Sequence, residues 1–351
     1  MITILKKVDD RSWVLKIFLA GLILFNFNQA NSQYDFTTLD KTLASQRRTL
    51  GGNACVLVYK DNQVVFSRNI GQYNSDTREP IASCSKWLTA ALVMTFVDEG
   101  KLSVDDYIAK YLPQFSEDGK ALIKIRYCLS HTSGIESKPI TLGSLVERKK
   151  FSTLAEEVNT FAVTPMAGEP GKVFAYSNIG LNIVGRILEV ISGKDFESLF
   201  QERIARPLGM NNTTFAGKYA INPSGGAIST ASDYLKFLSM ILGNGIYQGK
   251  RILSENSIRL MQQSETTNAR ILYVPGGAEE FEYGFGEWIQ GKDADGNSTI
   301  ISSPGLFGTY PVIDKIRNYA AIIFVKNLQV RNRKETDSAI KEAIDLSFTK
   351  Q

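Results

Sequence analysis

The sequence predicts an α+β protein in which one sheet is built from both ends of the chain. Three observations favour this class. A helix and a strand–turn–strand pattern open the fold, helical periodicity dominates residues 101–220, and short β-rich runs followed by a helix close the chain. A helical segment inserted between two parts of one sheet accounts for this order.

Residues 1–32 carry the features of a secretory signal peptide. Four basic side chains precede the apolar segment 17–25, and small residues follow at 30–32. We expect cleavage after Ser32, with Ala30 as the alternative, and hence a periplasmic or secreted protein. The competing interpretation is an uncleaved anchor, but a membrane span needs about 20 apolar residues and this segment is shorter. We therefore expect no stable membrane insertion after cleavage.

The first elements of the fold are a helix and a hairpin. Apolar residues at helical spacing between Phe36 and Leu43 predict the helix. The strand-like runs 54–59 and 63–66 flank Asp61-Asn62, a pair that favours a tight turn.

The next stretch is Ser83-Cys84-Ser85-Lys86, followed by the apolar run 87–94. Its apolar period predicts a buried helix with Ser83 at the N-terminus. Residues three apart share a helix face, so the Ser83 hydroxyl and the Lys86 amine point the same way, as a nucleophile and its base would. The pattern is common by chance and recurs at Ser347–Lys350, where we assign no role.

The same rules predict the remaining elements. Helices are expected at 179–191 and 196–204, and a capping box at Thr230 begins another. The predicted strands are 283–289, 299–302, 309–313 and 319–325. The last helix carries Ile340, Ile344 and Phe348.

Composition and charge exclude some functions. The chain has 351 residues, 43% of them hydrophobic, which is enough for a large core. Removing residues 1–32 takes away four basic and two acidic side chains, so the net charge falls from +4 to +2. This balance gives no case for nucleic-acid binding. The basic clusters 148–150 and 331–334 are interpreted as solvated surface.

Cysteine and histidine are scarce. The three cysteines, Cys55, Cys84 and Cys128, are widely spaced and do not suggest a disulfide framework, so we expect free thiols. The single histidine, His131, excludes a multi-histidine metal site and leaves one candidate for a Ser-His-Asp arrangement. We expect no metal and no cofactor.

A second candidate motif is Tyr176-Ser177-Asn178, in the loop before the helix at 179–191. In an extended segment, residues two apart face the same side, so Tyr176 and Asn178 would project into one cleft. A phenol can relay protons, and an amide can bind a carbonyl group. The alternative is an ordinary loop that leads into a helix.

The third candidate is the stretch 302–310, which contains Ser303-Pro304-Gly305-Leu306. Small residues in an expected strand mark a close approach of the backbone to another group. A substrate laid along this strand could take hydrogen bonds from it, so Ser303, Gly305 and Leu306 are candidate substrate-binding residues. The backbone N–H of Leu306 could pair with that of Ser83 as an oxyanion hole. The alternative is a glycine-rich bulge that packs against a helix.

Taken together, Ser83-x-x-Lys86, Tyr176-x-Asn178 and a Gly-containing strand near the C-terminus resemble the serine β-lactamase and penicillin-binding-protein superfamily. The sequence is most similar to its class C β-lactamase-related branch, which includes esterases, D-aminopeptidases and D-Ala-D-Ala carboxypeptidases. Other segments are similar to signature loops of the branch: 129–135, 170–178, 206–210 and 225–233. The resemblance spans residues 36–326.

The resemblance implies a β-lactamase/transpeptidase-like fold, with an antiparallel sheet flanked by helices and a mostly helical inserted domain. Residues 33–85 and 225–351 would form the discontinuous sheet domain, and residues 86–224 the helical domain. The active site would lie between them.

The resemblance also implies a role for each motif residue. Ser83 would be the acylated nucleophile and Lys86 its proton acceptor. Tyr176 would help to protonate the leaving group and to activate the deacylating water, and Asn178 would hold the substrate carbonyl. The N–H groups of Ser83 and Leu306 would form the oxyanion hole.

Two further positions bear on this resemblance. His131 falls in a loop that the family uses structurally. The third motif of the family usually begins with Lys or His, whereas this chain has Ser303-Pro304-Gly305. The missing cation would attract a substrate carboxylate, so activity on β-lactams and D-Ala-D-Ala peptides is in doubt. The alternative is that an arginine from the Arg270 loop or the Arg331 region enters the cleft and replaces the missing charge.

These features predict a secreted serine hydrolase that cleaves an ester or amide of a small-molecule or peptide acyl substrate. One alternative is a class C-type β-lactamase or D-Ala-D-Ala carboxypeptidase. Another is a non-catalytic binding protein with the same fold, although such a role would not require Ser83, Lys86, Tyr176 and Asn178 together.

Overall fold

The computed structural model describes residues 34–140, 143, 148–328 and 333–349. The predicted signal peptide, residues 1–32, lies outside this range. Within the described ranges, no helix combines the length and the apolar character that crossing a bilayer requires.

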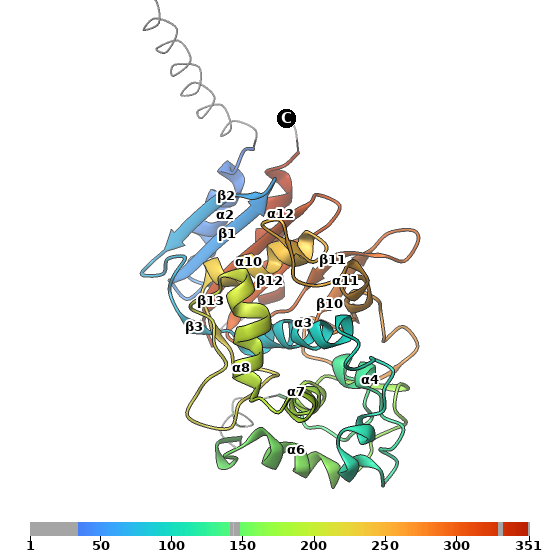
Figure 1. Cartoon of the computed structure of the whole chain (residues 1–351). Coiled ribbons are helices and arrows are strands. Elements are labelled where there is room, and N and C mark those ends of the chain that lie inside the picture. The colour runs from blue at the N-terminus through green and yellow to red at the C-terminus, as the bar shows by residue number, and fades with distance from the viewer. Residues whose placement is uncertain (1–33, 141–142, 144–147, 329–332, 350–351) are drawn as a thin grey trace, which may run out of the picture.

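The largest element is a seven-stranded antiparallel sheet with the order β2-β1-β13-β12-β11-β10-β9 (Figure 1). Its strands are β1 (Ala54–Lys60), β2 (Gln63–Ile70), β9 (Glu282–Tyr283), β10 (Trp288–Lys292), β11 (Ser298–Ser302), β12 (Gly308–Asp314) and β13 (Tyr319–Lys326). The N-terminal hairpin thus pairs with the last strand, from Ala54 opposite Val325 to Lys60 opposite Tyr319. The predicted α+β class, with one sheet built from both chain ends, is confirmed.

The helices of the described chain are α2 (Thr37–Gln46), α3 (Ser85–Asp98), α4 (Ile125–Leu129), α6 (Leu154–Ala162), α7 (Ile179–Ser192), α8 (Phe196–Phe200), α9 (Arg206–Leu208), α10 (Ala231–Leu242), α11 (Glu255–Met261) and α12 (Arg333–Leu346). Pairs of short strands complete the fold: β3 (Glu79–Pro80) with β5 (Ile228–Ser229), β4 (Val173–Ala175) with β8 (Arg270–Tyr273), and β6 (Ile246–Tyr247) with β7 (Lys250–Arg251).

Alternate residues of β1 face opposite sides of the sheet, and each side packs against different helices. Val56 and Val58 belong to the cluster with α2 and α12, whereas Cys55 and Leu57 belong to the cluster that contains α3 and α10. The hairpin turn agrees with the sequence, because Asp61 and Asn62 both have positive φ, at 51° and 62°.

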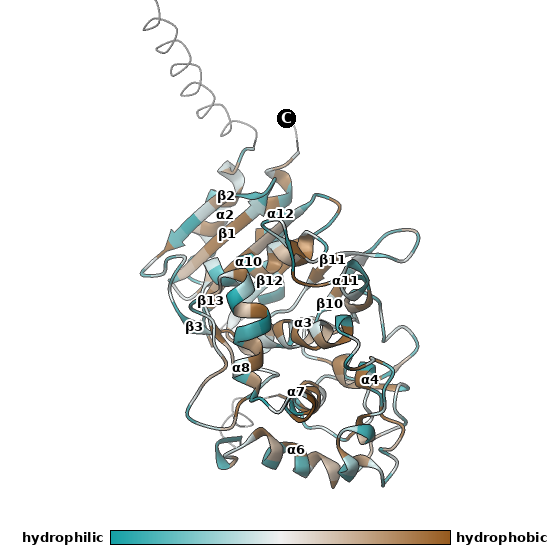
Figure 2. Ribbon diagram, viewed as in Figure 1, coloured by the Kyte–Doolittle hydropathy of each residue, from teal (hydrophilic) through white to brown (hydrophobic). Residues whose placement is uncertain are grey.

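The helix α3 lies between the large sheet and the helices α4, α6 and α7 (Figure 1). Its residues from Ser85 to Phe96 are all buried, as the apolar run predicts. Figure 2 shows hydrophobic residues along α7 and β1, and hydrophilic residues on many peripheral loops. Because α3 is held in the interior, the short segment that leads into it, where Ser83 lies, is held in place as well.

Two predicted strands differ from the structure. The run 283–289 is interrupted, because residues 284–287 form a bend between β9 and β10. Residues 303–307 form a turn between β11 and β12 rather than a strand. Glycines interrupt the extended pattern in both places, with Pro304 as well in the second. Gly286 packs closely against α3, and Gly305 against the segment that precedes it.

The bend between β9 and β10 carries an unusual buried carboxyl group. Glu287 is fully buried, and neither of its oxygens makes a hydrogen bond with the described chain. Burial raises the pKa of Glu287 well above its usual value, against smaller opposing effects of Lys315 and Trp87. The folded state therefore holds this carboxyl group in its neutral form.

We expect Glu287→Gln to remove a pH dependence of stability. In the wild type, the free energy of unfolding contributed by Glu287 falls as pH rises above about 4.3, because only the unfolded state ionises there. Denaturant titrations at pH 5 and pH 8 measure this fall, and the exposed variant Glu117→Gln is the control. Equal falls in the wild type and in Glu287→Gln would contradict the assignment.

Candidate active site

Ser83 lies in a short 3-10 helix, Ala82–Cys84, that leads into α3. The preceding residue, Ala82, has a φ of +45°, an uncommon conformation for a residue other than glycine. One turn later, Lys86 places its Nζ atom 3.2 Å from Ser83 Oγ. The structure thus brings the predicted nucleophile and base into hydrogen-bond contact.

Lys86 is a lysine without solvent exposure. Its Nζ atom donates to the Ser224 carbonyl oxygen at 2.8 Å and to Asn178 Oδ1 at 3.2 Å. Burial lowers the pKa of Lys86 to about 7, with a smaller opposing effect of Cys84. Near neutral pH, a large fraction of Lys86 is therefore a neutral amine that can accept a proton.

Tyr176 follows β4 and packs against the same amine. Lys86 Nζ lies 4.9 Å from the centroid of the Tyr176 ring, and the Trp288 ring stacks on Tyr176 at 5.3 Å. Burial raises the pKa of Tyr176 above its usual value, and a hydrogen bond with Ser83 opposes this effect. Tyr176 is therefore a neutral phenol that can donate a hydrogen bond.

Asn178 also faces Lys86, but for a different reason from the one predicted. It is the N-cap residue of α7 with helical dihedral angles, φ −89° and ψ −12°, so the segment from Tyr176 is not extended throughout. Its side chain is held by the hydrogen bond from Lys86 rather than by strand alternation. The two side chains meet at Lys86 from different backbone conformations.

Gly305 explains the small residues of the third stretch. A Cβ atom at Gly305 would lie 2.2 Å from the Ile81 carbonyl oxygen, so only glycine lets this turn approach the segment of the nucleophile. Among the described residues, no acceptor is bonded to the backbone N–H of Ser83 or of Leu306. Both groups are available to an oxyanion.

Ser303 was expected to contact substrate, and the structure places it elsewhere. Its side chain is 2% exposed, and its hydroxyl donates to the Gly286 carbonyl oxygen at 2.9 Å. It is also absent from the walls of the cavity that contains Ser83. The hydroxyl turns inward because the bend at Gly286 offers a buried acceptor.

The cavity that contains Ser83 has a volume of about 390 Å³. Aromatic side chains form much of its wall: Tyr176, Tyr273, Phe281, Trp288 and Tyr310. Pro304, Gly305 and Leu306, from the third stretch, also line it. An acyl group bound here would meet mainly apolar surface.

Cations also reach this cavity, an alternative that the sequence left open for the Arg331 region. Arg333 and Lys334 line it, although the cluster 331–334 was interpreted as solvated surface. Arg333 Nη2 donates to the Thr309 carbonyl oxygen at 3.2 Å, and its Nε lies 3.4 Å from Asp337 Oδ2. Only the packing of α12 beside the sheet brings these residues near Ser83.

The cluster 148–150 also departs from a purely solvated face. Arg148 forms an ion pair with Glu157, whose side chain is almost fully buried. Burial of one partner of an ion pair draws the other toward the protein interior, so Arg148 is partly buried as well.

The free-thiol prediction is confirmed: Cys55, Cys84 and Cys128 are all free and buried. His131 is also buried, and its Nε2 atom lies 3.2 Å from Tyr283 Oη. It does not line the cavity that contains Ser83.

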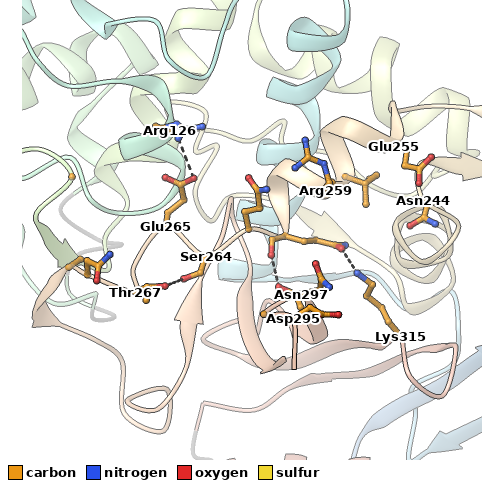
Figure 3. Close-up of a pocket in the computed structure, with 18 of the residues that line it drawn as sticks. Arg126, Asn244, Glu255, Arg259, Ser264, Glu265, Thr267, Asp295, Asn297 and Lys315 are labelled. Carbon is orange, nitrogen blue, oxygen red and sulfur yellow. Dashed lines mark hydrogen bonds and ion pairs between the residues drawn. The ribbon is translucent and has the colours of Figure 1, made fainter. Parts of the chain in front are cut away.

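A second cavity, of about 900 Å³, is larger, but none of the described serine and threonine hydroxyls that line it is bonded to an amine (Figure 3). Its charged groups include the ion pair of Arg126 with Glu265, at 3.8 Å, and Lys315, which donates to Gln262. The Thr267 hydroxyl donates to Ser264, and no amine bonds to either one. The smaller cavity, at Ser83, is therefore the stronger candidate for an active site, because its serine hydroxyl is bonded to an amine.

Comparisons with known proteins agree with this geometry. The family model described as Beta-lactamase matches residues 37–344. A crystal structure of a putative beta-lactamase from Bacteroides dorei DSM 17855 is 32% identical, with a TM-score of 0.81, over 90% of this chain and 100% of its own. The D-alanyl-D-alanine-carboxypeptidase/endopeptidase AmpH of Escherichia coli K12 is 24% identical over 84% of each chain. Esterase EstB of Burkholderia gladioli is 28% identical over 48% of each chain.

We expect the reactivity of Ser83 to rise with pH through about 7, because Lys86 accepts a proton only when it is neutral. The measurement is the rate at which a fluorophosphonate labels the protein between pH 5.5 and 9. Lys86→Ala should label about 10²–10⁴-fold more slowly and lose this midpoint. A wild-type rate that stays flat over this range would contradict the assignment of Lys86 as the base.

Proposed function

Because the chain belongs to the beta-lactamase family, we propose that it is a serine hydrolase that forms an acyl-enzyme at Ser83 and cleaves an ester or amide. One observation carries the proposal: the buried Lys86 amine, with a pKa lowered to about 7, lies 3.2 Å from the Ser83 hydroxyl. Such a pair can activate serine without a histidine.

In acylation, Ser83 Oγ attacks the substrate carbonyl carbon while its proton passes to Lys86 Nζ. The oxyanion that forms accepts hydrogen bonds from the N–H groups of Ser83 and Leu306. Collapse of this intermediate breaks the bond to the leaving alcohol or amine. The leaving group takes a proton from the Tyr176 hydroxyl, which Lys86 re-protonates, so Lys86 is neutral again.

In deacylation, water attacks the acyl carbon and gives up one proton through Tyr176 to Lys86. The second intermediate collapses with Ser83 Oγ as the leaving group, and this oxygen recovers the proton. The products are a carboxylic acid and the free enzyme. Asn178 would hold the carbonyl end of the substrate, since its amide already lies at the Lys86 amine.

A second candidate function is hydrolysis of substrates with a carboxylate, such as β-lactams or D-Ala-D-Ala peptides. It is favoured by Arg333, which supplies the cavity with a cation that Ser303 does not. Burial raises the pKa of Asp337 to about 7 even beside this guanidinium, so the pair leaves Arg333 partly uncompensated at neutral pH. AmpH, a carboxypeptidase by name, is among the relatives.

We also propose the location and the domain division that the sequence predicts. The features of residues 1–32 support export to the periplasm or the medium. Residues 33–85 with 225–351, and residues 86–224, would be two domains with Ser83 at their junction. The substrate would be a small molecule or a peptide, since the cavity has about 390 Å³ of space.

The test of the function is labelling with a fluorophosphonate, location of the adduct by mass spectrometry, and an assay with a p-nitrophenyl ester. Ser83→Ala should lose both the adduct and the hydrolysis, since it removes the hydroxyl that is bonded to the Lys86 amine. Ser347→Ala, in the other Ser-x-x-Lys sequence, should change neither. Wild-type turnover by Ser83→Ala would show that the nucleophile is wrong, and labelling without turnover would favour a binding protein.

The second candidate function has its own test. If Arg333 binds a substrate carboxylate, Arg333→Gln should lower kcat/KM for a chromogenic cephalosporin about 10- to 100-fold, the worth of a charge-assisted hydrogen bond. A neutral p-nitrophenyl ester should be little affected. Lys334→Gln is the matched control, because Lys334 also lines the cavity but lies 3.5 Å from Glu280. No reaction of the wild type with the cephalosporin would exclude this function.

A further inference from the structure

We propose that His131 is a positioning residue that holds Tyr176 in its working orientation, an inference that rests on the proposed role of Tyr176 as proton donor. His131 follows α4 and has a φ of +60°. A residue other than glycine adopts this left-handed conformation uncommonly, although histidine does so more often than most, and surrounding contacts help to stabilise it. Those contacts all lead to Tyr176 or to its neighbours.

The backbone on both sides of Tyr176 is bonded to His131. The Ala175 N–H donates to the His131 carbonyl oxygen at 3.0 Å, and the Ser177 N–H donates to His131 Nδ1 at 3.4 Å. The Tyr176 N–H itself donates to the Tyr273 carbonyl oxygen at 3.1 Å. Three consecutive amides are therefore fixed, and His131 holds the outer two.

The imidazole ring also supports the phenol ring directly. The His131 and Tyr176 ring centroids are 4.5 Å apart, and those of His131 and Tyr283 are 4.8 Å apart. On Tyr176, the stacked Trp288 ring and the Lys86 amine make further contacts. The orientation of the Tyr176 hydroxyl toward Ser83 thus depends on a packed set of rings that includes His131.

The hydrogen bonds of the imidazole define its tautomer. Nδ1 accepts from Ser177, so the proton is on Nε2, which lies 3.2 Å from Tyr283 Oη and can donate to it. Burial, together with the nearby Lys86, lowers the pKa of His131 well below its usual value. A neutral imidazole with both nitrogens engaged, outside the cavity walls, is not placed to act as a base on Ser83.

The experiment uses two esters of butyric acid that differ only in the leaving group. p-Nitrophenolate leaves without a proton, whereas ethoxide needs one, so only ethyl butyrate depends on a proton donor. Values of kcat/KM for both esters report the steps up to acylation. A structural defect alone would lower both values alike, and a misplaced Tyr176 lowers mainly the value for ethyl butyrate.

Two variants separate the contacts of His131. His131→Phe keeps an aromatic ring but has no acceptor for the Ser177 N–H, and it should lower kcat/KM for ethyl butyrate about 10- to 100-fold, the usual effect of a misplaced catalytic group. The same variant should change the p-nitrophenyl value by about twofold or less. His131→Asn tolerates positive φ and sets Oδ1 where Nδ1 stood, so it should lose less than His131→Phe.

A cycle with Tyr176→Phe decides whether His131 acts through Tyr176. In the Tyr176→Phe background, which should itself be selectively slow on ethyl butyrate, His131→Phe should cause little further loss. An equal loss in both backgrounds, or equal losses on the two esters, would overturn the proposal. If Tyr176→Phe lowers kcat/KM equally for the two esters, the proposed role of Tyr176 is wrong, and the inference about His131 is then wrong as well. If Tyr176→Phe is selectively slow on ethyl butyrate but the His131 variants lose kcat/KM equally on both esters, only the inference about His131 is rejected.

Discussion

The whole site depends on keeping an amine without solvent exposure at Lys86. A buried ammonium is costly, and the protein offers it only neutral oxygen acceptors, from Ser83, Asn178 and Ser224. Among the residues that the structure describes, no carboxylate is bonded to the amine. No opposite charge therefore compensates an ammonium there, and burial lowers the pKa of Lys86 to about 7. The apolar length of α3 is the structural cause, since it places this residue in the interior.

The fold could be predicted largely from the sequence because its elements have strong local signals. The apolar run of β1, the Asp61-Asn62 turn and the capping Thr230 each specify their own structure within a few residues. The order of these elements then indicated a sheet made from both chain ends. The run 283–289 was harder, because its glycines serve close packing and not the sheet: Gly284 packs against the end of α11, and Gly286 against α3.

The candidate site was predictable in part. The relation of Ser83 to Lys86 follows from helix geometry, and Gly305 follows from the need for a close approach. The local sequence around Arg333 does not show that this residue lines the cavity. Its position there depends on how α12 packs, and α12 lies far along the chain from Ser83. Ser303 looked exposed to substrate in the sequence, and only the bend at Gly286 explains why its hydroxyl turns inward.

The pairing of β1 with β13 has a consequence for synthesis and folding. The hairpin made early in translation has an open edge until the last strand arrives, and the turn at Gly305 that packs on Ile81 also comes late. A nascent chain therefore carries its serine long before it has a complete site around it. The proposed site would therefore be complete only after the Gly305 turn and β13 have been made, and a shorter nascent chain would lack groups that the proposed acylation needs.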